Sequence, residues 1–498
     1  MIRETYDKIA KQEEVRKNLI QLRQEIKIKG VAPLVYYLAG NYELFYRLLE
    51  HEDAKVRKNV ALIMGELRVP EFRTKLWEAY EKEDKLFVKA DYLVALRGYN
   101  YIPLLDKLKQ RLAFLTNGEF EETSLKHINE EIRILTQMII AIEQPLKHTF
   151  LGEREPSDLL LLTNRDHREV TLEQIEKGEA RVFNAGLVVQ TNDLNEILEL
   201  RTFSELLFRL KEVTKVPNEP GLAAEALIKG GLITFLETRH KEPAPFYFRV
   251  ELKTKQCLER KGSFAKKLAE ELEKKSQRKL INSTSNYEIE LRLIQSKEED
   301  CNVLLKLYTI EDKRFDYRKN AIAASIQPVH AALIARLAKP YLKEGATVLD
   351  PFCGVGTMLI EREKLVKAEN MYGIDSFGEA IDKAIENSDL AKAAIYFINK
   401  DFFEFNHKYL FDEIFTNMPT VTGRKTEAEI KLLYSRFFKK ALELLKEDAI
   451  LVLYTRNHDF IEEIVMKQKA YHIRESYLIS KKEGAYLYIL QVNKEYNY

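Results

Sequence analysis

Apolar side chains in the first part of the chain recur at the spacing of an α-helix. Two blocks that begin about 32 residues apart share this spacing: Val56, Val60, Ile63 and Leu67 in the first, and Val88, Tyr92, Ala95 and Leu96 in the second. Positions spaced three and four residues apart lie on one face of a helix, so each block predicts an amphipathic helix with its apolar face buried. Residues 1–148 are therefore predicted to be nearly all helical, either as stacked repeats or as a plain helical bundle.

From about residue 149 the pattern changes from helical spacing to alternation. Arg181–Gln190 predicts a strand, a turn and a second strand, and Phe246–Leu252 and Tyr287–Ile294 alternate as half-buried strands do. We expect Glu199–Phe208 to be a strand or turn that enters a helix, and residues 263–276 to be a helix. Residues 149–318 are therefore predicted to form an α+β domain.

The last third of the chain alternates short apolar runs with helical segments. Ala346–Asp350 predicts a buried strand, which is followed by the turn Pro351–Gly356 and the helix Thr357–Val366. A strand, a glycine-containing turn and a helix open a Rossmann-like unit, which predicts a seven-stranded, mostly parallel sheet over residues 319–498. Further strands are expected at Tyr372–Asp375, Ala394–Ile398, Phe411–Phe415 and Ile450–Tyr454, with a final hairpin, one strand antiparallel, at His472–Leu478 and Ala485–Val492.

The turn after the first of these strands is a candidate cofactor site. Gly354 and Gly356 allow the backbone to approach a ligand closely. Asp375 ends the next strand, about 25 residues after Asp350, where a carboxylate can accept hydrogen bonds from ribose hydroxyls. An NAD-dependent enzyme is disfavoured, because Leu359 stands where its pattern has a third glycine.

The fourth strand leads into Asn417-Met418-Pro419, which resembles the Asn-Pro-Pro-aromatic or Asn-Leu-Pro-aromatic element of enzymes that methylate exocyclic amines. An exocyclic base amine is a poor nucleophile because its lone pair is delocalised into the ring. An asparagine oxygen and a backbone carbonyl can accept both amine hydrogens, which directs the lone pair at a methyl donor and stabilises the developing positive charge. Asn417 with the Met418 carbonyl is the candidate pair, and Pro419 would fix the turn. Carbon-5 methylation needs a cysteine nucleophile, which this element lacks.

Charge narrows the class of partner. The 498 residues include 79 basic and 78 acidic side chains, a net charge of +1, so a nucleic acid would have to be held by a local patch. Residues 253–279 contain such a patch, with a clear excess of Lys and Arg, although a solvated helix face has the same composition. The residues that we assign to RNA binding there are Lys253, Arg260, Lys266 and Lys267.

The sequence also argues against several other classes of protein. No apolar run approaches the ~20 residues that span a bilayer, and the first residues form a charged helical pattern rather than a signal peptide. The cysteines, Cys257, Cys301 and Cys353, are far apart, so neither a zinc site nor a disulfide framework is expected. We expect a cytoplasmic protein without a membrane span or a bound metal.

Several segments of the chain resemble parts of known protein families. Asp350–Glu361 closely resembles the signature of the RNA methylase family that makes N2-methylguanosine, and residues 323–332 resemble its lead-in helix. The strands Phe248–Leu252 and Tyr287–Ile294, with the run Arg260–Ala265, resemble the THUMP RNA-binding module. Two shorter segments add to this likeness: Glu199–Thr202 resembles the small domain that precedes THUMP, and Asp53–Ala61 resembles a HEAT-like repeat.

These resemblances imply a multidomain fold class. The parts would be an all-α HEAT-like domain, an α+β THUMP-like domain and an α/β Rossmann-like class I methyltransferase domain. The implied cofactor is S-adenosyl-L-methionine (SAM), and the implied reaction is methylation of guanosine N2 in RNA, with transfer RNA as the expected substrate. The N-terminal helical domain is the candidate for binding a protein partner.

The resemblance also implies roles for single residues. The turn from Asp350 would hold the methionine part of SAM, Asp375 the ribose and Asp401 the adenine amino group. The full implied cofactor set is Asp350, Pro351, Phe352, Gly354, Gly356, Asp375, Ser376, Asp401 and Phe402. The implied catalytic residues are Asn417, Met418 and Pro419, and the implied substrate contacts near them are Thr420, Arg424 and Lys425.

Thr420 departs from the family pattern, which has an aromatic residue there to stack on the extruded base. Phe402, Phe403 and Phe405 are the candidates to replace it in space. Two alternative functions stay open. One is an amino-methyltransferase that acts on ribosomal RNA, DNA or protein. The other is a non-catalytic RNA-binding scaffold with a degenerate SAM fold, against which the retained glycines and acids argue.

Overall fold

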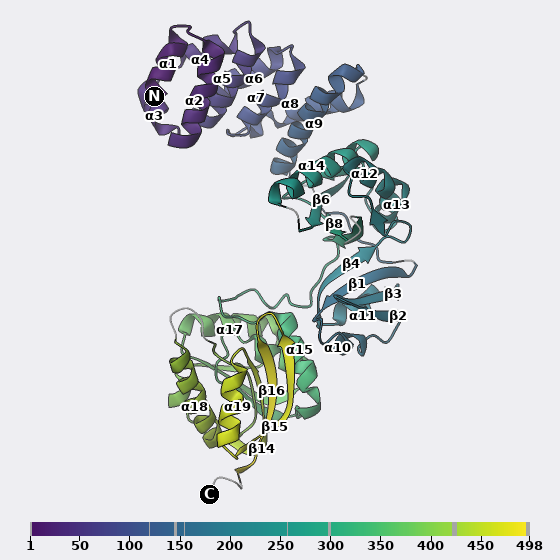
Figure 1. Ribbon diagram of the computed structural model, residues 1–498, viewed down its shortest axis with the longest axis vertical. Coiled ribbons are helices and arrows are strands. Elements are labelled where there is room, and N and C mark those ends of the chain that lie inside the picture. The colour runs from purple at the N-terminus through teal and green to yellow at the C-terminus, as the bar shows by residue number, and fades with distance from the viewer. Residues whose placement is uncertain are drawn as a thin grey trace. The chain divides into compact units, whose positions relative to one another are not determined.

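The computed structural model divides into two compact units, each with its own core (Figure 1). One unit comprises Met1–Lys147 and Ser283–Asn286, and the other comprises His148–Asn282 and Tyr287–Tyr498. No helix among the described residues is long and apolar enough to cross a membrane. The structure describes residues 2–118, 120–143, 147–153, 155–255, 257–296, 300–420 and 426–494.

The first unit is helical, as its apolar spacing predicted. The two blocks with matching spacing lie in neighbouring helices, where Gly65 approaches so closely that a Cβ on it would lie 2.6 Å from the Cα of Ala95. The helices are α1 (Ile2–Ala10), α2 (Val15–Lys29), α3 (Ala32–Leu38), α4 (Glu43–Leu49), α5 (Ala54–Leu67), α6 (Phe72–Lys82), α7 (Leu86–Leu96), α8 (Leu105–Asn117) and α9 (Glu122–Glu143), with a short 3-10 helix, η1 (Ile102–Leu104).

The second unit begins with a nine-stranded sheet in the order β2-β3-β1-β4-β9-β8-β6-β7, in which β5 also pairs with β9. Its strands are β1 (Ser157–Thr163), β2 (Glu179–Phe183), β3 (Gly186–Thr191), β4 (Phe203–Arg209), β5 (Lys215–Val216), β6 (Phe246–Lys253), β7 (Leu280–Asn282), β8 (Ile289–Gln295) and β9 (Cys301–Leu307). Its helices are α10 (Glu169–Leu172), α11 (Leu194–Glu199), α12 (Pro220–Lys229), α13 (Leu232–Glu237) and α14 (Leu258–Lys275).

One expectation for this region was wrong. Residues 199–208 do not enter a helix, because Phe203–Arg209 is a strand that pairs antiparallel with β1. Long-range packing decides the structure here, since Phe203 and Phe208 are fully buried in the core beside β1. The helix predicted at residues 263–276 is confirmed as α14, which begins five residues earlier, at Leu258.

The C-terminal sheet confirms the predicted doubly wound arrangement. Seven strands lie in the order β12-β11-β10-β13-β14-β16-β15, and all neighbouring pairs up to β14 are parallel. β16 runs antiparallel to both of its neighbours, as expected for the final hairpin. The strands are β10 (Ala346–Asp350), β11 (Ala368–Asp375), β12 (Tyr396–Asn399), β13 (Phe411–Asn417), β14 (Leu445–Thr455), β15 (Tyr471–Ser480) and β16 (Ala485–Val492).

Helices cover both faces of this sheet. Buried residues of α18 and α19 share one core with β13 and β14, and those of α15 and α16 share a second core with β10 and β16. The carboxyl ends of the parallel strands therefore stay open at one edge. The helical segments are α15 (Pro328–Ala338), η2 (Lys339–Tyr341), α16 (Thr357–Leu365), α17 (Gly378–Ala391), η3 (Phe402–Glu404), α18 (Glu427–Leu444) and α19 (His458–Lys467).

A buried ion pair joins the nine-stranded region to the helix that follows the candidate cofactor turn. The Nε and Nη2 atoms of Arg201 donate to the two carboxylate oxygens of Glu361 at 2.8 and 2.7 Å. Tyr317 donates a third hydrogen bond to Glu361, whose side chain is fully buried. The buried guanidinium of Arg314 donates to the carbonyls of Leu200 and Phe203 on the same side. These contacts tie α16 to the segment between α11 and β4.

We expect Arg201→Ala to lower the free energy of unfolding of this unit by about 3–5 kcal/mol, because it leaves the buried Glu361 carboxylate without its cation. The matched control is Arg456→Ala, which removes the pair with Glu483 in which both side chains are about half exposed. That loss should cost at most about 1 kcal/mol. Denaturant unfolding of the full chain measures both, and equal effects of the two variants would contradict this assignment.

Candidate active site

The turn between β10 and α16 is held against the end of β11 by backbone and side-chain hydrogen bonds. Gly354 and Gly356 adopt positive φ angles of 52° and 80°, a conformation that favours glycine. The Gly354 N–H donates to Oδ2 of Asp375 at 3.0 Å, and the Cys353 N–H donates to the carbonyl of Ile374 at 2.9 Å. A Cβ on Gly354 would meet only Ile322, at 4.0 Å. The backbone of the turn is thus accessible from this side.

Asp350 lies at the base of this turn and is completely buried. Its Oδ1 accepts hydrogen bonds from the Thr416 hydroxyl at 2.6 Å and from the Phe352 N–H at 3.1 Å. Its Oδ2 is buried, and no described residue gives it a hydrogen bond. Burial, with a smaller contribution from the negative charge of Asp375, raises the pKa of Asp350 to about 7. A cationic ligand group beside Oδ2 would supply the missing partner and favour the charged carboxylate.

The predicted catalytic turn follows β13 directly. Asn417 is the last residue of the strand and is half-buried, and no other described residue hydrogen-bonds its side chain. The Met418 N–H donates to the carbonyl of Tyr454 on β14 at 2.9 Å. Because Thr416 bonds Asp350, the residue before Asn417 is fixed to the cofactor turn. The structure therefore brings the Asn417 turn and the Asp350 turn to the same edge of the sheet.

The hydroxyl of a buried tyrosine holds the predicted catalytic turn in place. The Tyr434 hydroxyl donates to the carbonyl of Pro419 at 3.0 Å and shares a hydrogen bond with the Thr455 hydroxyl at 2.7 Å. Burial raises the pKa of Tyr434, so the hydroxyl stays protonated and able to donate. Sequence reasoning missed this residue, since a tyrosine on an amphipathic helix gives no sign of what its hydroxyl contacts.

Two predicted acids lie at neighbouring strand ends. Both Asp375 oxygens accept backbone N–H groups, one from Gly354 and one from Phe377 at 2.9 Å. Asp401 is exposed after β12, and its Oδ1 accepts the N–H of Phe403 at 2.9 Å, which begins η3. Ser376 is exposed beside Asp375, and the Phe377 ring that follows is 50% exposed. Sequence reasoning passed over Phe377, although an aromatic residue two positions after the acid of the second strand was a usable signal.

The three candidates for the stacking role of the aromatic residue absent at Thr420 differ in exposure. Phe402 and Phe405 are core residues, 2% and 4% exposed, so their faces are covered by protein. Phe403 is partly exposed, and the guanidinium of Arg436 lies 3.9 Å from its ring centroid. Phe403 is therefore the ring of these three with surface for a base. Arg424 and Lys425, predicted to contact substrate, lie outside the described residues.

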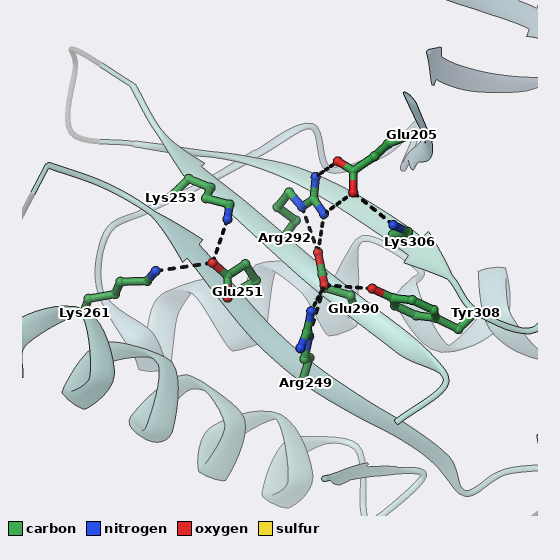
Figure 2. A network of polar contacts seen from close by, with 9 residues as sticks. All are labelled: Glu205, Arg249, Glu251, Lys253, Lys261, Glu290, Arg292, Lys306 and Tyr308. Atoms are coloured by element: carbon green, nitrogen blue, oxygen red, sulfur yellow. Dashed lines mark hydrogen bonds and ion pairs between the residues drawn. The ribbon is translucent and has the colours of Figure 1, made fainter. Parts of the chain in front are cut away.

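Part of the predicted basic patch is neutralised by its own neighbours. Lys253 and Lys261 both reach the carboxylate of Glu251, at 2.9 and 3.3 Å (Figure 2). Lys266 lies 3.8 Å from Glu270, a loose pair on an exposed helix face. Arg260 and Lys267 are exposed on α14, and no ion pair joins either of them to another described residue.

The rest of the sheet face in Figure 2 is a closed network of charges. Arg249 and Arg292 bond the buried Glu290, and Arg292 and Lys306 bond Glu205. The hydrogen bond from Arg292, with that from Lys306, lowers the pKa of Glu205 to about 2. Since each guanidinium here already has a carboxylate, phosphate contacts are better placed on α14 than on this face.

Comparison with known proteins identifies the chemistry of the C-terminal domain. Residues 316–480 match the family described as UPF0020, RMKL-like, methyltransferase domain. A comparison with curated proteins found no match. With its Rossmann-like sheet, the domain is a class I SAM-dependent methyltransferase domain, and SAM is its cofactor. The orphaned Oδ2 of Asp350 and the open backbone at Gly354 fit a ligand that carries an ammonium group.

Solved structures share the fold beyond this domain. TrmN from Thermus thermophilus has a TM-score of 0.51 and 20% identity, covering 67% of this chain and 99% of its own. SMU.472 in complex with SAH has a TM-score of 0.51 and 14% identity, covering 68% and 98%. A possible methylase from Clostridium difficile 630 has a TM-score of 0.50 and 18% identity, covering 68% and 98%. At these identities the likeness shows the fold alone.

The state of Asp350 should make SAM binding depend on pH. With a pKa of about 7 in the unliganded protein, Asp350 is neutral at lower pH and cannot pair with the SAM ammonium group. We expect SAM affinity to fall up to about tenfold per pH unit below 7. Calorimetric titration between pH 5.5 and 7 measures this.

The control is Asp350→Asn, which keeps the acceptor for Thr416 but cannot ionise. Any titration of SAM itself affects both proteins equally, so the ratio of the two affinities isolates Asp350. A ratio that does not change with pH would show that Asp350 does not bind the cation.

Proposed function

We propose that this protein transfers the methyl group of SAM to the exocyclic N2 amine of guanosine in transfer RNA. The observation that carries the proposal is the Asn417 turn, whose half-buried, unbonded amide sits at the sheet edge shared with the SAM turn. The resemblance of Asp350–Glu361 to enzymes that methylate guanosine N2 supports the choice of amine.

Different residues at the sheet edge would have different roles in the reaction. SAM, when bound, supplies an electrophilic methyl group on a positively charged sulfur. Asn417 Oδ1 and the Met418 carbonyl accept the two amine hydrogens, which turns the nitrogen lone pair toward the methyl carbon. As the new N–C bond forms and the S–C bond breaks, these oxygens stabilise the positive charge on nitrogen. The surplus amine proton then leaves to water.

Cofactor recognition would use the acids at the strand ends. Asp350 would pair with the methionine ammonium, Asp375 would accept the ribose hydroxyls and Asp401 would accept the adenine amine. The exposed ring of Phe377 would cover the adenine beside Asp375. The remaining members of the proposed cofactor set are Pro351, Phe352, Gly354, Gly356, Ser376 and Phe402.

Substrate recognition would combine base stacking with phosphate contacts. We assign the stacking role that Thr420 cannot fill to Phe403, the partly exposed ring. Arg260, Lys266 and Lys267 on α14 would hold phosphates in a THUMP-like module, and Lys253 would contribute after exchanging Glu251 for phosphate. Arg424 and Lys425 would serve near the target base. The helical N-terminal unit would be a HEAT-like domain.

Thr420 supports one second candidate, a non-catalytic RNA-binding scaffold, because the stacking aromatic is absent from its usual place. The deciding experiment is methyl transfer from labelled SAM to separated transfer RNA, ribosomal RNA and DNA, with the product nucleoside identified by mass spectrometry. N2-methylguanosine in transfer RNA is the expected product. SAM binding without product on any nucleic acid would favour the scaffold or a protein substrate, and product in ribosomal RNA or DNA would correct the substrate.

Asn417→Ala should lower kcat by about 10²–10³-fold, the typical loss when one preorganised group that stabilises transition-state charge is removed. SAM affinity and the melting midpoint should stay close to those of the unchanged protein, since no other described residue bonds the Asn417 side chain. Single-turnover kinetics with saturating SAM measure the effect. Full turnover by a variant that still binds SAM would exclude the proposed amine chemistry.

Tyr434 should act as a positioning residue for the catalytic turn. Tyr434→Phe removes the donor to the Pro419 carbonyl and should cost about 1–3 kcal/mol of stability. Tyr471→Phe is the matched control, because that buried hydroxyl donates to the Phe438 carbonyl at 2.6 Å, away from the turn. Both variants should lower the melting midpoint, but only Tyr434→Phe should lower kcat at unchanged KM for SAM. Equal kcat values would limit Tyr434 to a structural role.

A further inference from the structure

The first unit contains a groove of about 600 Å³ where three helices end side by side. α2, α5 and α7 each contribute residues from their C-terminal turns to its lining. The rim carries four basic side chains, Arg23, Lys27, Arg68 and Arg97. The floor is aliphatic and includes Ile26, Val31, Leu62 and Val94.

Small residues create the groove. A Cβ on Gly65 would lie 2.6 Å from the Cα of Ala95, and a Cβ on Gly98 would lie 2.8 Å from the carbonyl oxygen of Gly65. The ends of α5 and α7 therefore approach closely at positions that leave no bulky side chain on the surface. Val94 stands beside this contact with 43% of its surface exposed, so an aliphatic side chain faces the groove.

The positive charge of the rim exceeds what its neighbours neutralise. Among the described lining residues Glu66 is the only acidic one, and it already pairs with Arg23 at 3.0 Å. Lys27, Arg68 and Arg97 are exposed, and within the described ranges no carboxylate pairs with them. Cations near helix C-termini are stabilised by the helix dipole, which explains their tolerance at this place. Arg97 donates one hydrogen bond, to the amide oxygen of Gln137 at 3.3 Å, and its other N–H groups, with those of Lys27 and Arg68, can bind an anionic ligand.

We propose that this groove binds an acidic peptide segment of a partner protein. An aliphatic side chain of the peptide would fill the floor, and flanking carboxylates would pair with Arg68, Arg97 and Lys27. RNA fits this lining less well, because none of the described residues that line the groove has an aromatic ring on which a base could stack. This site is separate from the methyl-transfer chemistry and does not depend on the proposed RNA substrate.

The test is fluorescence anisotropy with the full chain and four labelled probes. The first is a peptide with one leucine between runs of glutamate, and the second replaces that leucine with serine. The third replaces the glutamates with lysine, and the fourth is an oligouridine. We expect the first peptide to bind at least about tenfold more tightly than the serine peptide, the loss that a buried leucine side chain implies. We expect the lysine peptide not to bind.

Charge reversal locates the site. Arg68→Glu combined with Arg97→Glu should lower the affinity for the leucine peptide at least tenfold more than Lys11→Glu combined with Lys55→Glu. Lys11 and Lys55 are exposed lysines outside the lining. Both double variants change the net charge equally, and their melting midpoints show whether each is folded. Val94→Ser leaves the net charge unchanged and should reduce the preference of the protein for the leucine peptide over the serine peptide.

Three outcomes would overturn the proposal. Equal weakening by the two double variants would mean attraction to net charge rather than to the groove. Equal affinities for the leucine and serine peptides would remove the aliphatic floor from the interaction. Tighter binding of oligouridine than of the leucine peptide, lost in the Arg68 and Arg97 double variant, would make the groove an RNA surface instead.

Discussion

The hydrogen bond from Thr416 to Asp350 is the contact on which the geometry of the candidate active site depends. It connects the end of β13 to the end of β10 across two strands that pair in parallel. A threonine hydroxyl inside a sheet needs a partner because burying it unbonded is unfavourable, and Asp350 needs a donor for the same reason. Each residue therefore satisfies the hydrogen-bonding requirement of the other. Asn417, the next residue in the chain, is thereby fixed relative to the candidate cofactor turn.

The same arrangement leaves one atom unsatisfied. Thr416 and the Phe352 N–H both use Oδ1 of Asp350, so Oδ2 stays buried without a hydrogen bond from any described residue. A folded protein tolerates such an atom where a ligand completes it. The raised pKa of Asp350 has the same origin, because a carboxylate with half of its hydrogen bonds missing is poorly solvated. Structure and electrostatics thus point to the same place for a cation.

Several buried carboxylates in the rest of the second unit bind arginines of the same unit. Glu361 binds Arg201 and Tyr317, and Glu290 binds two arginines on one sheet face. Buried pairs of this kind are costly to break, so they fix relative positions even when they add little net stability. The groove of the first unit is different, since Lys27, Arg68 and Arg97 surround an aliphatic floor with little opposing charge. These charges of the second unit are paired inside the protein, whereas those on the groove rim can bind a partner.

Helical spacing and glycine turns are local signals, and they were enough to predict the helical first unit and the seven-stranded, mostly parallel C-terminal sheet. The sequence also marked Asp350, Asp375 and Asn417. It could not show that Glu251 neutralises Lys253, that Phe402 is buried while Phe403 is partly exposed, or that Tyr434 supports Pro419. Those facts depend on which side chains meet across long separations in the chain, and only the tertiary structure decides that.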